Sequence, residues 1–143
     1  MLRVVFNPIH IDPETGDFKP SVIAEAMKWG CSVQRETHCD EQAAWALGER
    51  MADEKSQAAP DKPRAVHALA VLDVADLRRI ADEKGTRAVA VYDTAKVDNL
   101  AHADVCVIHP NRSAQRAARA DLFELARKGR KDRPTASAAH APA

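Results

Sequence analysis

Five short segments rich in apolar and β-branched residues recur along this chain, separated by stretches with helical patterns. Their alternation and their ends at polar residues, proline or glycine predict strands. The predicted strands cover residues 2–6, 31–35, 66–72, 88–92 and 104–108. In 66–72 both alternating sets of side chains are mostly apolar, which is typical of a central strand covered on both faces.

Four other segments have apolar residues at helical spacing and are predicted to be helices. They cover residues 21–29, 40–54, 73–84 and 113–128. Asp73 is a suitable N-cap for the third helix. Gly30 and Gly85 are suitable residues for ending the first and the third helix.

The order of these elements, β-α-β-α-β-α-β-β-α, predicts an α/β or α+β fold. We expect a three-layer-like sandwich in which helices cover a mixed, mostly parallel sheet of about five strands. Only the segment 94–103 joins the last two strands, whereas a parallel crossover usually takes a dozen residues or more. This length favours an antiparallel pair there, unless residues 95–100 form a short helix and restore a parallel arrangement.

The chain has 143 residues, a length that suits one domain with a sizeable core. The polar segment 55–64 contains two prolines and is predicted to be a flexible loop. Residues 130–143 offer little to bury and are predicted to form a disordered tail. We therefore expect a single globular domain over residues 1–129, followed by that tail.

The composition excludes several classes of protein. With 45% hydrophobic and 29% charged residues the chain is not disordered as a whole, and no apolar run approaches the ~20 residues of a membrane span. Three cysteines, an odd number, form no disulfide framework and favour a reducing, cytoplasmic location. The frequent alanine and arginine residues are associated with bacterial genomes of high GC content.

The formal net charge of zero conceals an uneven distribution of charge. Residues 1–60 carry 6 basic and 10 acidic side chains, whereas residues 111–143 carry 8 basic and 3 acidic ones. A basic end on a neutral protein is expected to attract phosphate, an acidic partner, or the acidic half of a second copy.

Three arginines in the last predicted helix are four and three residues apart and therefore lie on one helix face. They are Arg112, Arg116 and Arg119. Such a stripe could bind phosphate groups. The alternative is a solvated face whose arginines pair with Asp121 and Glu124 on the same helix.

Arg35, Asp93 and His102 are the candidate catalytic residues. Arg35 ends a predicted strand, and its planar guanidinium suits a carboxylate or a phosphate. Asp93 and His102 would meet across the open end of a hairpin, where a carboxylate could orient an acid–base histidine. His38 is a second candidate for the acid–base histidine. The structural alternatives are an ion pair of Arg35 with Glu36 or with an acidic residue of a helix, and a hydrogen bond that stabilises the loop.

A parallel arrangement of the last two strands would separate Asp93 from His102. Polar residues at the carboxyl ends of the strands would then gather along one sheet edge, where open α/β sheets bind ligands. These residues are Asn7, Arg35, Asp73, Asp93, His109 and Asn111. Asn111 is therefore a candidate binding residue in that arrangement.

No sequence motif names a reaction, and no cofactor is identified. The scattered glycines form neither a phosphate-binding loop nor a dinucleotide-binding pattern. The cysteines and histidines lack the spacing of a zinc site, so no metal site is predicted. Cys31 and Cys106 are instead expected to pack as small apolar side chains.

Three functions remain open at this stage. The first is a small cytoplasmic accessory or binding protein that contacts a nucleic-acid or protein partner through its basic C-terminal helix. The second is an enzyme that acts on a nucleotide or another phosphate-bearing ligand through Arg35, Asp93 and His102. The third is a structural subunit of a homo-oligomer whose acidic and basic ends associate between copies.

Overall fold

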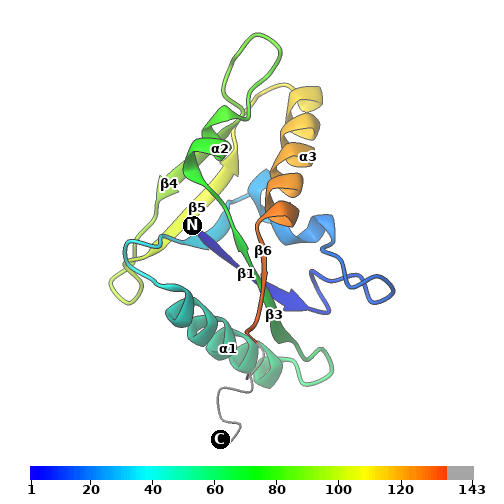
Figure 1. The fold of residues 1–143 in the computed structure, drawn as a ribbon, viewed down its shortest axis with the longest axis vertical. Coiled ribbons are helices and arrows are strands. Elements are labelled where there is room, and N and C mark those ends of the chain that lie inside the picture. The colour runs from blue at the N-terminus through cyan, green and yellow to red at the C-terminus, as the bar shows by residue number, and fades with distance from the viewer. Residues whose placement is uncertain (135–143) are drawn as a thin grey trace, which may run out of the picture.

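The computed structural model describes residues 1–134 and contains one six-stranded sheet with three α-helices and a 3₁₀ segment (Figure 1). The strands are β1 (Leu2–Asn7), β2 (Cys31–Gln34), β3 (Ala65–Val71), β4 (Val89–Asp93), β5 (His102–Val107) and β6 (Arg130–Asp132). The helices are η1 (Pro20–Met27), α1 (Glu41–Ala58), α2 (Val74–Arg79) and α3 (Arg112–Lys128).

Every neighbouring pair of strands in the sheet is antiparallel, and the strand order is β4-β5-β2-β1-β3-β6. The predicted three-layer-like sandwich with a mostly parallel sheet is therefore wrong. The antiparallel pairing expected for the last two predicted strands, β4 and β5, is confirmed, with Val89 opposite Val107 and Asp93 opposite Ala103.

The physical reason for the error lies in which strands become neighbours. Strands β2 and β3 both run antiparallel to β1, so they point in the same direction, and α1 connects them as a crossover would. Strand β1 lies between them, however, and separates the two strands of that unit. Strands β3 and β4 also share a direction and are joined through α2, yet they lie far apart in the sheet. Successive strands are commonly but not always neighbours.

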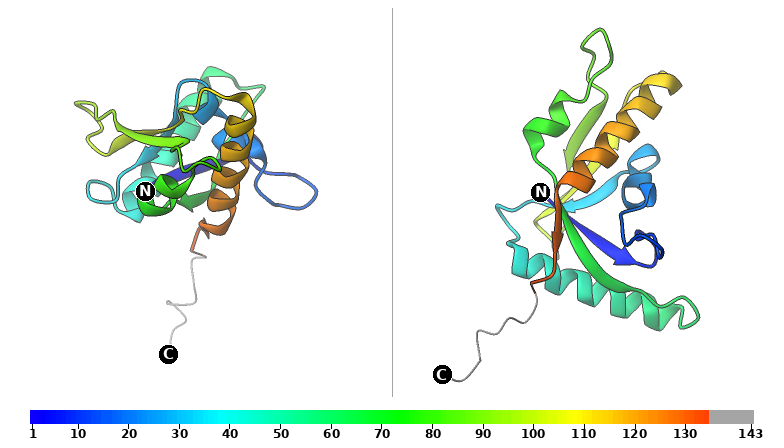
Figure 2. Two further views of the ribbon diagram at one scale, coloured as in Figure 1. Left: turned by 90° about the horizontal axis from the view of Figure 1, so that it is seen from above. Right: turned by 45° about the vertical axis from the view of Figure 1, so that its right-hand side comes forward.

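The sheet separates two hydrophobic clusters. The larger one contains residues of η1, α2 and α3, including Ile23, Leu77 and Leu122, all fully buried. The smaller one lies under α1, where Trp45 packs with Phe6 and other residues of β1 and β3. Helices α1 and α3 lie toward opposite ends of the molecule, and β6 runs between them (Figures 1 and 2).

Strand β6 forms within the segment predicted to be a disordered tail. It pairs with β3, with Arg130 opposite Ala70. The Arg130 guanidinium lies 5.0 Å from the centre of the Phe18 ring, and that of Arg133 lies 5.5 Å from the centre of the Trp45 ring. Cation–π contacts thus anchor a stretch that has no apolar side chains of its own. The rest of the predicted tail, 135–143, lies outside the described residues.

Other element boundaries differ from the sequence pattern by a few residues. Helix α1 extends to Ala58, so the predicted loop 55–64 begins as helix. Within the last turn of α1, the Ser56 hydroxyl donates to the carbonyl of Arg64 and accepts from its amide. Helix α2 ends at Arg79, well before the predicted end of that helix. In the part of the chain that the structure describes, no helix has both the length and the apolar character to cross a membrane.

Candidate functional site

The structure brings together two of the three predicted catalytic residues. Arg35 and Asp93 form an ion pair of 3.0 Å, and Arg35 also donates to the carbonyl of Leu100. Asp93 lies opposite Ala103 in the sheet, so its side chain and that of His102 are on opposite faces. The expected contact between Asp93 and His102 is absent from the hydrogen bonds of the described residues.

The Arg35–Asp93 pair has a structural role in this arrangement. The second carboxylate oxygen of Asp93 accepts from the amide of Ala95, so the pair fixes the start of the β4–β5 loop. The side chain of Asp93 is 64% exposed, so the ion pair is largely in solvent. An exposed pair of this kind contributes at most about 1 kcal/mol to stability.

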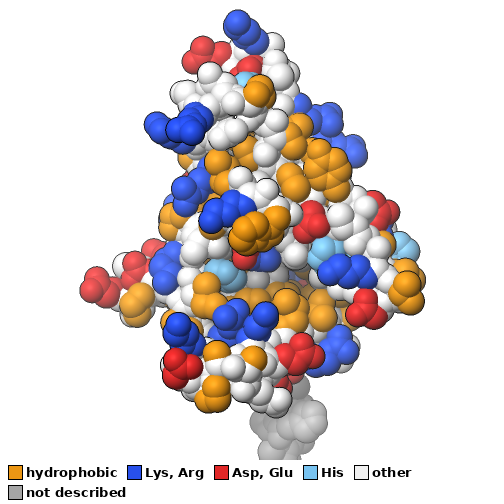
Figure 3. All heavy atoms as spheres, turned by 180° about the vertical axis from the view of Figure 1, so that it is seen from behind, with side chains coloured by type: hydrophobic (Ala, Val, Ile, Leu, Met, Phe, Trp, Pro, Cys, Tyr) orange, Lys and Arg blue, Asp and Glu red, His pale blue; other side chains and the backbone are white. Residues whose placement is uncertain are grey.

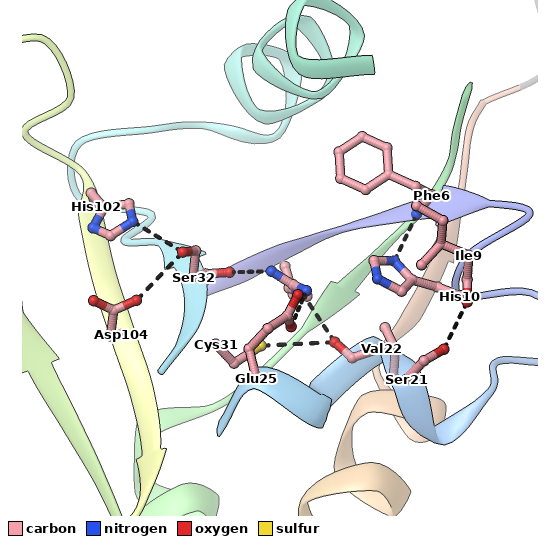
Figure 4. A network of polar contacts seen from close by, with 11 residues as sticks. Phe6, Ile9, His10, Ser21, Val22, Glu25, Cys31, Ser32, His102 and Asp104 are labelled. Atoms are coloured by element: carbon pink, nitrogen blue, oxygen red, sulfur yellow. Dashed lines mark hydrogen bonds and ion pairs between the residues drawn. The ribbon is translucent and has the colours of Figure 1, made fainter. Parts of the chain in front are cut away.

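His102 belongs to a different polar network, and Figure 4 shows its contact with Ser32 and that of Ser32 with Asp104. Its Nδ1 atom is 2.7 Å from the hydroxyl of Thr94 and 3.3 Å from the Thr94 carbonyl oxygen. Its Nε2 atom is 3.2 Å from Oγ of Ser32, and that hydroxyl is 3.4 Å from a carboxylate oxygen of Asp104. A hydroxyl group therefore lies between an imidazole and a carboxylate.

The register of β2 and β5 explains why these side chains meet. Ser32 is directly opposite Asp104, and Gln34 is opposite His102, so all four residues share one face of the sheet. The residues between them, such as Val33 and Ala103, are buried in the core on the other face. We call Ser32, His102 and Asp104 the Ser–His–Asp cluster.

The Ser–His–Asp cluster lines a pocket of about 310 Å³ that also contains Thr94, Lys96 and Trp29. Arg3 and Glu25 form another part of the wall. The buried guanidinium of Arg3 donates to the carbonyls of Val22 and Ser32 and forms a 2.8 Å ion pair with Glu25. Every nitrogen of this guanidinium is occupied, so Arg3 supports the pocket rather than offering a free cation.

Sequence reasoning found His102 and missed its partners. Ser32 and Asp104 occupy polar positions that alternate with apolar ones in two strands, and this alternation was the available signal. The pairing of β2 with β5 could not be seen, because the two strands are distant in sequence. Arg3 was hidden because a single arginine in an apolar strand gives no indication of its partners.

His38, the second candidate for the acid–base histidine, is exposed and lies in another pocket with Cys39 and Arg50. Burial, followed by the nearby Asp40 carboxylate, raises the pKa of Cys39, which disfavours the reactive thiolate. Burial likewise raises the pKa of Cys31 to about 11. These thiols therefore have the character of structural cysteines.

Asn111 acts as the N-cap of α3, since its side-chain oxygen accepts from the amides of Ser113 and Ala114. His109, two residues before Asn111, accepts from the Asn111 amide at Nδ1 and lies 2.9 Å from the Asp82 carboxylate at Nε2. That hydrogen bond from His109 is the main reason for the lowered pKa of Asp82, and the amides of Thr86 and Lys84 add to it. Asn111 and His109 thus hold the start of α3.

The predicted arginine stripe consists of exposed side chains on one side of α3. Its members Arg112, Arg116 and Arg119 have no carboxylate within ion-pair distance among the residues that the structure describes. On the same helix Glu124 pairs with Arg127, at 2.9 Å. The alternative, in which the arginines of the stripe pair with Asp121 and Glu124, is therefore wrong for the described residues.

Other basic residues near the C-terminal end have acidic partners. Lys131 pairs with Glu41 and Arg133 with Glu49, both acids belonging to α1. The uneven charge seen in the sequence is thus partly neutralised within the chain, and the arginine stripe and Lys128 have no acidic partners among the described residues. On the face seen in Figure 3, basic and acidic side chains are dispersed among hydrophobic ones.

Within residues 1–134, no group of three or more histidine, cysteine, aspartate or glutamate side chains could hold a metal ion. Comparisons with known proteins give no further guide to the chemistry. No protein-family model, no curated protein and no solved structure matches this chain.

Proposed function

We propose that this protein binds nucleic acid through the arginine stripe of α3. The observation that carries the proposal is the alignment of three exposed arginines on one face of α3 without acidic partners, whereas Arg127, Lys131 and Arg133 nearby are paired. An arginine already paired with a carboxylate must lose that contact before it can bind a phosphate. The free-energy cost of breaking an ion pair does not arise among the described residues for the stripe, which consists of Arg112, Arg116 and Arg119.

The spacing of the stripe supports a phosphate-backbone ligand. At a rise of 1.5 Å per residue, Arg112 and Arg119 are roughly 10 Å apart along the helix axis. This length suits contacts to neighbouring phosphates of one strand. Each guanidinium can donate two hydrogen bonds to one phosphate. Such contacts position a protein on nucleic acid and do not read sequence, because they do not touch the bases.

The test is fluorescence anisotropy with a labelled 20-base-pair DNA duplex of mixed sequence at physiological salt concentration. The wild-type protein is expected to bind with a dissociation constant within the general range of nonspecific binding, about 10⁻⁴–10⁻⁶ M. The R112A/R116A/R119A variant is expected to bind at least about tenfold more weakly. No binding by the wild type, or equal binding by both proteins, contradicts the proposal.

A matched control changes the same number of charges elsewhere. Arg50, Lys55 and Lys62 are exposed residues of α1 and the loop after it, and none has an ion-pair partner among the described residues. The R50A/K55A/K62A variant is expected to retain the affinity of the wild type. Equal losses in both triple variants would show that net charge, rather than the stripe, determines the binding.

A further inference from the structure

The Ser–His–Asp cluster has the geometry of a nucleophile next to its base. We propose that Ser32 is a catalytic nucleophile, that His102 is its general base, and that the pocket hydrolyses small esters. This activity is independent of nucleic-acid binding, since the pocket includes no residue of the arginine stripe.

The surroundings of His102 define which proton arrangement makes the serine nucleophilic. When Nδ1 carries the proton, it can donate to the hydroxyl and carbonyl oxygens of Thr94, at 2.7 and 3.3 Å. Nε2 then presents its lone pair to the Ser32 hydroxyl, 3.2 Å away. This is the serine–histidine relation of covalent hydrolases, with the oxygens of Thr94 orienting the imidazole.

In the other arrangement Nε2 carries the proton and donates to Ser32, whose hydroxyl then donates to Asp104 over 3.4 Å. The 3.4 Å contact is long for a hydrogen bond between oxygens. The contact between Ser32 and Asp104 therefore stabilises this arrangement only weakly, which favours the first arrangement, in which the Ser32 hydroxyl donates to Nε2.

The pocket limits the class of substrate. Its volume of about 310 Å³ is at the lower end for small-molecule sites, so the ester is small. Lys96 lines the same pocket and has no ion-pair partner among the described residues. Its ammonium group is a suitable cation for the oxyanion that forms when the carbonyl is attacked.

The reaction consists of two balanced steps. Oγ of Ser32 forms a bond to the acyl carbon and its proton passes to Nε2 of His102, after which the ester C–O bond breaks and the alcohol leaves with that proton. A solvent water molecule then gives a proton to His102 and bonds to the acyl carbon. The bond to Ser32 breaks, Ser32 recovers a proton, and a carboxylic acid is released.

The experiment treats the full-length protein with a fluorophosphonate probe and locates the adduct by peptide mass spectrometry. In the wild type the adduct is expected on Ser32, formed with loss of fluoride. His102→Gln is expected to slow labelling by about 10²-fold or more, the usual effect of removing a general base. Ser32→Ala is expected to give no adduct at that position.

Ser21 provides a matched control, because its hydroxyl is also partly buried but donates only to the carbonyl of Ile9. Ser21→Ala is expected to label and to hydrolyse p-nitrophenyl acetate like the wild type. The inference is overturned if the wild type carries no adduct on Ser32, or if His102→Gln reacts at the wild-type rate. The site mapping in the wild type needs no variant, so a folding defect cannot obscure the result.

Discussion

His10 shows how strongly burial can alter a single side chain in this protein. Its Nδ1 atom accepts from the amide of Phe6, and only 4% of the residue is exposed. Burial, reinforced by the positive charges of Arg3, Arg64 and Lys19, lowers the pKa of His10 from 6.5 to about 3. The folded protein therefore keeps this histidine neutral in mildly acidic solution.

This shift predicts a loss of stability in acid. The unfolded chain protonates His10 as the pH falls below about 6.5, whereas the folded chain does not until about pH 3. The stabilising contribution is complete above pH 6.5 and is lost toward pH 3, by about 1.4 kcal/mol per pH unit.

The measurement is urea unfolding of the wild type and His10→Asn between pH 7 and 4. Asparagine can still accept from the Phe6 amide but does not titrate, so its stability is expected to depend less steeply on pH. His38→Asn, at an exposed position, is the control. Identical pH slopes for the wild type and His10→Asn would refute the prediction.

Arg3 is the residue that holds the pocket wall in place. Arg3→Met is expected to cost about 1–3 kcal/mol, because it leaves the carbonyls of Val22 and Ser32 and the Glu25 carboxylate without their donor. Thermal and urea unfolding measure the loss. Arg50→Met, at an exposed position, is expected to change stability by less than about 0.5 kcal/mol. Equal effects of the two substitutions would contradict this role.

At the scale of elements, the junction of α3 and β6 depends on Gly129. The Gly129 carbonyl accepts from the amide of Val71, and a Cβ atom at this position would overlap the carbonyl oxygen of Val71. Side-chain volume cannot be added there unless β6 moves away from β3.

Gly129→Ala is accordingly expected to destabilise the protein by about 1–3 kcal/mol, as overpacking does. It should also increase hydrogen exchange at the Val71 amide, since this amide donates to the Gly129 carbonyl. Lys128→Ala, one residue earlier on the exposed side of α3, is the control and should behave like the wild type. Unchanged protection of Val71 in the glycine variant would show that the junction tolerates a side chain.

Local patterns were sufficient to predict most elements but not β6. The five predicted strands and four helical segments all have counterparts, because apolar periodicity follows directly from burial on one face. Strand β6 consists of Arg130, Lys131 and Asp132, and its position depends on contacts with Phe18 and Glu41 that are remote in sequence. The mostly parallel sheet was mispredicted for the same reason, because long-range pairing inserted β1 between β2 and β3.

The partners in the candidate site also depend on long-range strand pairing, which local sequence patterns do not reveal. The sequence predicts a role for His102 from its position beside a strand end, but the partner of that histidine depends on sheet register. With Asp93 opposite Ala103, the carboxylate faces away, and Ser32 and Asp104 on other strands take its place. Arg35 and Asp93 were both candidates because they lie at the ends of predicted strands, but their ion pair is a finding of the structure.

For the whole molecule, charge is the property that connects sequence with the proposed function. The acidic α1 already contacts the basic C-terminal segment through Glu41 and Glu49. These pairs lie within one chain, so they reduce the charge complementarity available for association between copies. The homo-oligomer hypothesis remains a prediction, to be checked by light scattering at several salt concentrations. The arginine stripe remains the strongest basis for attracting a polyanion.

The most direct test is the salt dependence of DNA binding. If Arg112, Arg116 and Arg119 each neutralise one phosphate, the logarithm of the association constant should fall against the logarithm of salt concentration with a slope of about −2.7. The R112A/R116A/R119A variant should give a slope near zero, with residual binding only. A wild-type slope near zero, or the same steep slope in the variant, would contradict the account.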